Sequence, residues 1–103
     1  GLSGCTQLQR LYLYANAIKV IENLNGLKRL EHLWLNENMI NKIEGLSGAK
    51  RLKELNLASN QIRFIGTSLA ENTELEVLNL ADNKISSFQV SIAFYSKKQS
   101  HSK

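Results

Sequence analysis

The sequence predicts an α/β solenoid with a short parallel sheet on its concave side and 3₁₀ or irregular turns on its convex side. The first observation is a repeated frame, L-x-x-L-x-L-x-x-N-x-I-x-x-Φ with Φ apolar, which starts at positions 8, 30, 52 and 75. Its period is 22, 22 and then 23 residues, and every specified position is matched in all four copies. The second observation is that the apolar spacing of the frame fits neither a single strand nor a single helix. Each copy therefore contains several short elements, and copies at this period predict a solenoid.

The first part of each copy has the alternation of a strand. Leu33 and Leu35 point to one side of the chain, and His32, Trp34 and Asn36 point to the other. We expect parallel strands near residues 10–14, 32–36, 54–58 and 77–81. No single coil can bury its leucines alone, so the stacking of coils must close the core.

An asparagine follows each strand, where the chain must turn back. Its carboxamide can donate to and accept from main-chain groups that a turn leaves unpaired. Stacked copies would form a structural ladder of Asn16, Asn38, Asn60 and Asn83. After this corner, apolar residues recur at every third position, as at Ile40, Ile43, Leu46 and Ala49. That period is typical of 3₁₀ or extended turns rather than of an α-helix.

The third copy has one extra residue in its return segment. There, Ser68 and Glu71 have the three-residue separation of a capping box, which predicts a short helix. The slot filled by Leu27 and Ala49 in the earlier copies holds Asn72 in this one. We expect a looser return segment to leave the Asn72 side chain in solvent.

The repeated frame resembles that of leucine-rich repeat proteins. The 22-residue period is similar to that of their short cytosolic class, which includes the nuclear regulatory subunit of protein phosphatase 1, a spliceosomal scaffold protein and an axonemal dynein light chain. The resemblance implies a segment of a horseshoe-shaped solenoid, with repeats at 8–29, 30–51, 52–74 and 75–88, the last of them partial. Residues 1–7 match the end of a preceding repeat. We therefore expect a fragment of a longer array or a truncated isoform.

The last segment, residues 89–103, diverges from the frame. Val90, Ile92 and Phe94 alternate with other residues, which predicts a short capping strand. The polar residues 96–103 are expected to be disordered. An exon end followed by a splice donor would also encode Gln-Val-Ser at positions 89–91, so a native, a capping and an intron-derived origin all stay open.

Composition narrows the setting of the protein. A single cysteine and the absence of an N-x-S/T sequon favour a reducing interior. We expect a cytoplasmic protein, and the resemblance adds a nuclear or a ciliary, axonemal setting. No run of 18 apolar residues is present, so no membrane span is predicted. The net charge is +4, but three lysines lie in the tail, and the remainder has 10 basic and 9 acidic residues. That balance argues against direct nucleic-acid binding.

No constellation of residues predicts an enzyme. The two histidines, His32 and His101, are 69 positions apart, and the single cysteine, Cys5, occupies an apolar slot of the frame. No cluster of histidine, cysteine or carboxylate residues has the spacing of a metal site, and no glycine-rich phosphate loop is present. We therefore predict no catalytic residue, no cofactor and no metal.

The outward-facing strand positions predict a surface that binds another protein. Stacked strands place these positions in columns on the concave side, where three of the seven aromatic residues fall. Tyrosine and tryptophan beside arginine are typical of binding hot spots. The predicted partner-binding residues are Arg10, Tyr12, Tyr14, His32, Trp34, Asn36, Glu54 and Asn56. A second interpretation is that a neighbouring segment covers these rings, or that the sheet simply accommodates them.

These observations predict a non-catalytic scaffold or adaptor that binds a protein partner of unknown identity across the concave sheet. The resemblance adds two alternatives, which are a regulatory subunit of a serine/threonine phosphatase and an RNA-associated scaffold. The repeat frame does not specify the contact residues of either alternative, so none is carried over.

Overall fold

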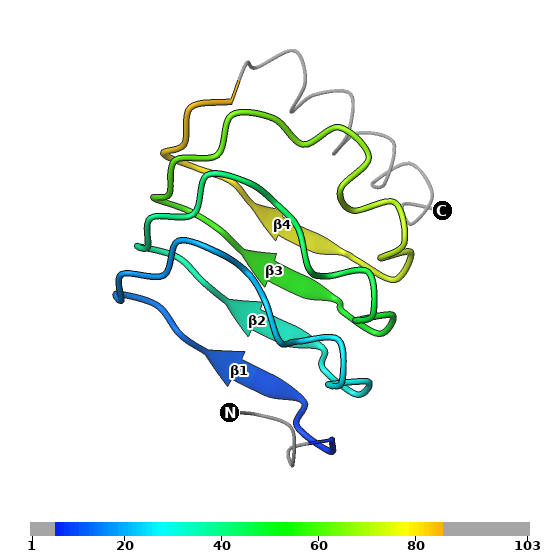
Figure 1. The fold of residues 1–103 in the computed structure, drawn as a ribbon. Helices are drawn as coiled ribbons and strands as arrows, with labels where there is room; N and C mark the ends of the chain where they lie inside the picture. The colour runs from blue at the N-terminus through cyan, green and yellow to red at the C-terminus, as the bar shows by residue number, and fades with distance from the viewer. Residues whose placement is uncertain (1–5, 86–103) are drawn as a thin grey trace.

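The computed structural model describes residues 6–85, which form stacked coils with a four-stranded parallel sheet along one side (Figure 1). The strands are β1 (Arg10–Tyr12), β2 (His32–Trp34), β3 (Glu54–Asn56) and β4 (Val77–Asn79), in that order across the sheet. The predicted solenoid with a short parallel sheet is confirmed. The predictions for residues 1–5 and 86–103, including those for Cys5 and for the capping strand at Val90, Ile92 and Phe94, lie outside the described residues.

The sheet pairs equivalent positions of successive coils. One row of paired residues is Arg10, His32, Glu54 and Val77, and the next outward row is Tyr12, Trp34, Asn56 and Asn79. The pairing therefore follows the period of the sequence without a slip. Each outward side chain lies beside its equivalent in the neighbouring coil, which sets the columns of the concave face.

Each strand begins where the sequence predicts and ends two residues earlier. Beyond β2, the Leu35 N–H donates to the Asn56 carbonyl at 2.8 Å, and the Glu37 N–H donates to the Ala58 carbonyl at 2.9 Å. Glu37 has a φ of 58°, in the left-handed region. The five-residue strands of the prediction are therefore too long, because hydrogen bonding between coils continues into backbone that is already turning.

The left-handed conformation recurs at the corner of every described coil. Ala15 and Glu37 have a φ of 58°, and Ser59 and Asp82 have a φ of 57°. None of these residues is glycine, and a side chain with a Cβ costs about 1–2 kcal/mol in this conformation. The corners therefore store local strain that the hydrogen bonds between coils must offset.

We expect Glu37→Gly to raise the free energy of unfolding by about 0.5–1 kcal/mol. Glycine removes the Cβ strain, and its larger entropy in the unfolded chain offsets part of the gain. Met39→Gly is the matched control, because Met39 is exposed and is not among the described residues with positive φ. That control should lose stability in urea denaturation. Equal losses in the two variants would show that the corner is unstrained.

The core is a continuous column of leucine and isoleucine between the sheet and the return segments. In the second coil, Leu33, Leu35, Ile40 and Ile43 are at most 2% exposed and belong to one cluster. The other buried apolar residues are Ile21, Leu24, Leu27, Leu30, Leu46, Ala49, Leu52, Leu55, Leu57, Ile62, Ile65, Leu69 and Leu75. Leu13, in the first described coil, is only partly buried, because that coil has a described neighbour on one side alone.

The return segments contain isolated turns of the 3₁₀ type. The Leu27 N–H donates to the Leu24 carbonyl at 3.0 Å, and the Leu30 N–H donates to the Leu27 carbonyl at 3.1 Å. The second and third coils repeat this pair of bonds, whose three-residue step is that of a 3₁₀ turn. The predicted 3₁₀ or irregular turns are confirmed. Within residues 6–85 there is no helix, and hence none long and apolar enough to cross a membrane.

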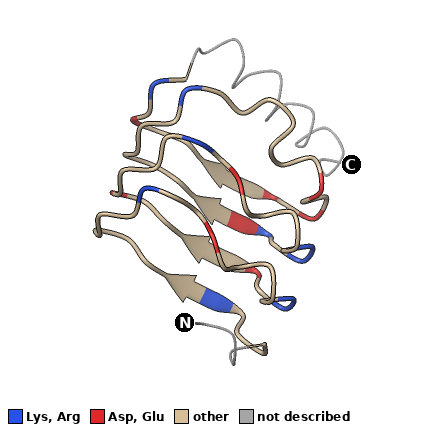
Figure 2. Ribbon diagram, viewed as in Figure 1, with Lys and Arg blue, Asp and Glu red and all other residues tan. Residues whose placement is uncertain are grey.

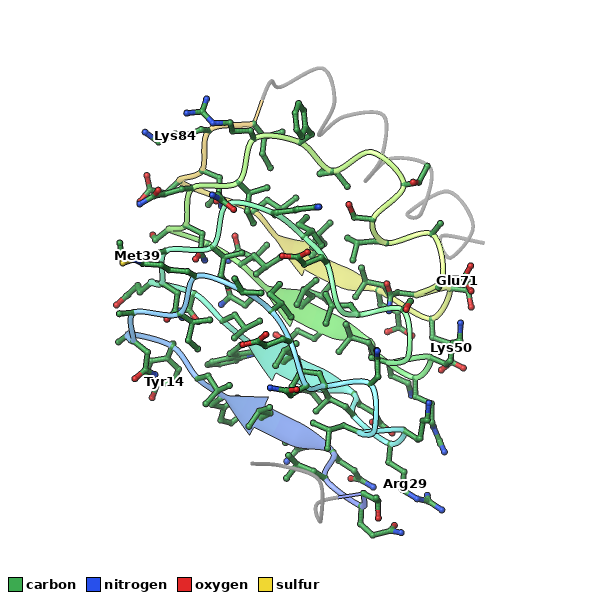
Figure 3. The ribbon with its side chains drawn as sticks, viewed as in Figure 1. Tyr14, Arg29, Met39, Lys50, Glu71 and Lys84 are labelled. Carbon is green, nitrogen blue, oxygen red and sulfur yellow. The ribbon has the colours of Figure 1, made fainter. Side chains whose placement is uncertain are left out.

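The short helix predicted at Ser68 is wrong. Residues 66–71 form turns, and the Ser68 N–H donates to the Ile65 carbonyl at 3.0 Å. The Glu71 carboxylate accepts a hydrogen bond of 2.7 Å from Nζ of Lys50, on the neighbouring coil (Figure 3). This hydrogen bond and the charge of Lys50 lower the pKa of Glu71. The supposed capping glutamate therefore links two coils instead of starting a helix.

The expectation that Asn72 faces solvent is also wrong. Its side chain is 0% exposed, and its Nδ2 donates to the Leu46 carbonyl at 2.9 Å and to the Ala49 carbonyl at 3.1 Å. Both carbonyls belong to the turn of the preceding coil. A polar side chain is stable in this apolar slot because main-chain acceptors meet its amide.

Candidate functional site

Three aromatic side chains gather on the outward face of β1 and β2. The ring centroids of Tyr12 and Trp34 are 4.7 Å apart with an interplanar angle of 39°, and those of Tyr14 and Trp34 are 6.3 Å apart at 51°. Both separations are typical of favourable contacts between tilted rings. Tyr12 is 48% and Tyr14 is 50% exposed, whereas Trp34 is partly buried. We name Tyr12, Tyr14 and Trp34 the aromatic platform.

Two polar atoms at the platform are buried without a hydrogen-bond partner among residues 6–85. They are Nε1 of Trp34, which is a donor, and Oδ1 of Asn36, which is an acceptor. A buried polar group that lacks a partner costs about 1–3 kcal/mol. The two unpaired atoms therefore offset part of the free energy that the ring contacts contribute to the isolated chain.

Charged side chains border the platform. Nδ1 of His32 and Oε1 of Glu54 are 2.8 Å apart, and each of the two side chains is 29% exposed. Arg10 is exposed and pairs in register with His32. The structure therefore brings a guanidinium, an imidazole and a carboxylate into one row beside the rings.

Asn56 is partly committed to its own turn. Its Oδ1 accepts a hydrogen bond of 3.1 Å from the Ala58 N–H, and Asn79 makes the same bond to Ala81. One of the two acceptor positions of the Asn56 oxygen is therefore used within its own turn. Six of the eight predicted partner-binding residues lie in paired strand positions, and the other two, Tyr14 and Asn36, follow β1 and β2 by two residues. Their contact with a partner stays a prediction.

The asparagine ladder joins each corner to the coil before it. Nδ2 of Asn38 donates to the Leu35 and Asn36 carbonyls of its own turn, at 3.0 and 3.1 Å, and to the Leu13 carbonyl of the preceding coil at 3.1 Å. Its Oδ1 accepts from the Ile18 N–H at 3.0 Å. One carboxamide therefore satisfies four main-chain groups and fixes the position of two coils.

The ladder continues through the described coils. Asn60 and Asn83 make the same four kinds of hydrogen bond as Asn38. Asn38 and Asn60 are 8% and 7% exposed, and Asn83 is partly buried. Asn16 is exposed and bonds within its own turn, to the carbonyls of Leu13 and Tyr14. These asparagines are structural, and they hold the outward columns in place.

Sequence reasoning missed a second surface, on the return side of the solenoid. Asn41, Lys42, Arg63, Phe64 and residues 65–68 line a hollow of about 500 Å³. Two signals in the sequence point to it. The extra residue of the third repeat falls in the segment that lines the hollow, and Phe64 falls at an outward position next to Arg63.

The chemistry of these surfaces suits non-covalent binding. Among residues 6–85, no group of three or more histidine, cysteine, aspartate or glutamate side chains could hold a metal ion. The concave face offers rings, a guanidinium and one imidazole–carboxylate pair, and the return side offers cations and a ring. Both sets of groups can make ionic and aromatic contacts with another molecule.

A family model described as Leucine Rich repeats (2 copies) matches the chain twice, at residues 6–48 and 50–92. The chain belongs to the leucine-rich repeat family. Strands β1 and β2 lie in the first match, and strands β3 and β4 lie in the second. No curated protein matches this leucine-rich repeat chain.

Solved structures are similar to most of this leucine-rich repeat chain. Internalin C2 of Listeria monocytogenes is 35% identical with a TM-score of 0.75, over 82% of this chain and 37% of that one. A second internalin of the same bacterium is 28% identical with a TM-score of 0.79, over 89% and 27%. The Drosophila melanogaster SNF/U2A' complex contains a chain that is 29% identical with a TM-score of 0.69, over 88% and 54%. This chain therefore spans 27–54% of the length of these three structures.

Proposed function

We propose that this leucine-rich repeat chain is a non-catalytic module that binds a segment of a protein partner on the concave face of its sheet. The observation that carries this proposal is the aromatic platform, three touching rings next to Arg10 and the His32–Glu54 pair. Aromatic side chains offer large contact area at small entropy cost, since each has only two rotatable torsions. The neighbouring charges would set the register of the bound segment.

The unpaired polar atoms of the platform support the same proposal. Nε1 of Trp34 and Oδ1 of Asn36 are buried, so a partner would contact them only after neighbouring side chains move aside. A peptide main chain carries both an acceptor for the indole N–H and a donor for the amide oxygen. Binding that supplies both groups removes the cost that these atoms carry in the isolated chain.

Trp34→Ala is expected to weaken partner binding by about 2 kcal/mol or more, as hot-spot truncations do. The free energy of unfolding should change by less than about 1.5 kcal/mol, because Trp34 is only partly buried on the outward face of the sheet and its ring contacts are with two exposed tyrosines. Lys42→Ala probes the return side, and Arg29→Ala, at an exposed position away from both surfaces, is the neutral control. Titration calorimetry and urea denaturation measure the two quantities. Binding that survives Trp34→Ala and fails with Lys42→Ala would place the partner on the other face.

Finer assignments rest on the resemblance of the repeats. A phosphatase regulatory subunit and an RNA-associated scaffold remain the alternatives, and similarity to a chain of the Drosophila SNF/U2A' complex supports a role within a larger assembly. The first two repeats most resemble leucine-rich repeat-containing protein 9, and that resemblance stays a prediction. We propose a cytoplasmic setting, with a nuclear or ciliary one as alternatives.

A pull-down with and without nuclease, followed by mass spectrometry, separates these functions. A direct protein partner is retained after nuclease treatment and is lost with the Trp34→Ala bait. Recovery of a phosphatase catalytic subunit would favour the regulatory alternative. Loss of all partners after nuclease treatment would favour the RNA-associated scaffold and contradict the proposed direct contact.

A further inference from the structure

The hollow on the return side lies beside the turn that contains the extra residue of the third repeat. The backbone turns through Gly66 with a φ of 52°, and a Cβ placed there would meet no atom within 4 Å. The corresponding turn of the second coil passes through Gly45, where a Cβ would come within 2.4 Å of the Ile21 carbonyl oxygen. The second coil therefore closes against the first, whereas the turn at Gly66 leaves open space.

Two cations and an exposed ring line this hollow. The Lys42 side chain is 72% exposed, and its nearest acidic partner, Glu44, is 3.9 Å away. Arg63 has no acidic partner within 4 Å in the described part of the chain. Phe64 is 65% exposed, the largest exposure among the large apolar residues in residues 6–85. Among residues 6–85, Arg63 therefore has no close ion pair, Lys42 has only its exposed pair with Glu44, and most of the Phe64 ring is exposed.

Cations and apolar groups continue along the return segments. Lys19 occupies the frame position of Arg63 two coils earlier, and Val20, equivalent to Phe64, is 47% exposed. Figure 2 shows blue segments at corresponding places on successive return segments, with red segments in a separate row beside them. The face is therefore a mixed cationic and apolar strip, with Glu22 and Glu44 along one border.

We propose that this hollow binds an acidic segment of a partner protein. Its carboxylates would meet Lys42 and Arg63, and an apolar side chain of the same segment would pack on Phe64. Charge complementarity selects the occupant, because Arg63 has no acidic partner within 4 Å among residues 6–85 and the exposed Lys42 has only the 3.9 Å contact with Glu44, so both cations can attract carboxylates. The volume of about 500 Å³ suits a few side chains of an extended segment. A nucleic acid is the competing occupant, because the same cations attract phosphates, and the titration described below distinguishes the two.

This surface is separate from the aromatic platform. The platform projects from the outward side of β1 and β2, whereas the hollow is built by return segments of the second and third coils. The inference therefore goes beyond the proposed function, and each can fail without the other.

A titration followed by two-dimensional NMR of the ¹⁵N-labelled chain tests the proposal. The probe is an acetylated twelve-residue peptide of aspartate and glutamate with one central phenylalanine, and the control peptide replaces the acids with asparagine and glutamine. The acidic peptide should shift amide signals of residues 41–42 and 63–68. Arg63→Glu should raise its dissociation constant about tenfold or more, and Phe64→Ala should raise it about fivefold. Arg29→Glu, an exposed charge reversal at the far edge of the coils (Figure 3), should have an effect below about twofold.

Three outcomes would overturn the proposal. They are equal dissociation constants for Arg63→Glu and Arg29→Glu, amide shifts that centre on residues 12, 14 and 34, and tighter binding of oligouridylate than of the peptide at the same amides. Arg63 and Phe64 are exposed, so their variants should keep the melting temperature of the parent chain. Trp34→Ala should leave peptide affinity unchanged, which separates this test from that of the concave face.

Discussion

Leu35→Ala is expected to lower the free energy of unfolding by about 2–5 kcal/mol. Leu35 is 2% exposed and lies in the second coil, which has described coils on both sides. Its own N–H donates to the Asn56 carbonyl at 2.8 Å, so the backbone cannot move inward to fill the space left by the side chain. The loss therefore includes both the burial of the leucine and the cavity that remains.

The same slot in the neighbouring coils supplies matched controls. Leu57 is 0% exposed, so Leu57→Ala should cost as much as Leu35→Ala, whereas Leu13 is only partly buried and Leu13→Ala should cost about 1–2 kcal/mol. Urea denaturation followed by the fluorescence of Trp34, the single tryptophan, measures all three losses. A loss below about 1 kcal/mol for Leu35→Ala, or equal losses for Leu35→Ala and Leu13→Ala, would contradict a core closed by stacking.

Asn60→Leu is expected to cost about 3 kcal/mol, although leucine has nearly the size of asparagine. Each buried main-chain group that it leaves unpaired costs about 1–3 kcal/mol. The substitution removes the acceptor of the Ile40 N–H at 2.9 Å and the donor to the Leu35 and Leu57 carbonyls, each at 3.0 Å. All of these groups are buried, so water cannot replace the lost bonds.

Asn16→Leu is the control for the ladder. Asn16 is exposed and bonds only within its own turn in the described residues, so its loss should stay below about 1 kcal/mol. Hydrogen exchange adds a local readout, since the Ile40 amide should exchange faster in Asn60→Leu and unchanged in Asn16→Leu. If Asn60→Leu unfolds with the same free energy as the parent chain, the asparagine ladder makes no net contribution to stability.

The sequence predicts the fold well because each position of the repeated frame must meet one physical requirement. Leu33 and Leu35 must share a face, the asparagine must meet a turning backbone, and the every-third spacing after Ile40 excludes an α-helix. The regular period then determines the register, so the columns that hold Tyr12 and Trp34 follow directly. The contact between His32 and Glu54 follows from the same register.

The irregular third repeat shows where sequence reasoning fails. Ser68 and Glu71 satisfy a local helix-start motif, but the closer partner of Glu71 is Lys50 on another coil. A polar residue such as Asn72 is expected to face solvent, yet its Nδ2 donates hydrogen bonds to two carbonyls of the preceding coil. In both cases contacts between coils override local preference, and those contacts depend on where main-chain groups point.

The details of the two surfaces are equally hidden from the sequence. Whether the Trp34 indole N–H has a partner depends on the rotamers of neighbouring rings, which no spacing determines. The hollow beside Phe64 depends on the path of residues 65–68, which the spacing of the sequence does not determine. The sequence predicts which site residues share a column, but it does not predict which of their atoms are accessible to a partner.

Photo-crosslinking tests most directly whether the concave face is the binding surface. Benzoylphenylalanine replaces Tyr14 in one variant and Phe64 in another, which are both exposed aromatic positions, on the concave face and on the return side respectively. Each variant is irradiated with the partner recovered in the pull-down. The account predicts a crosslinked product from position 14. A product from position 64 with none from position 14 would contradict it.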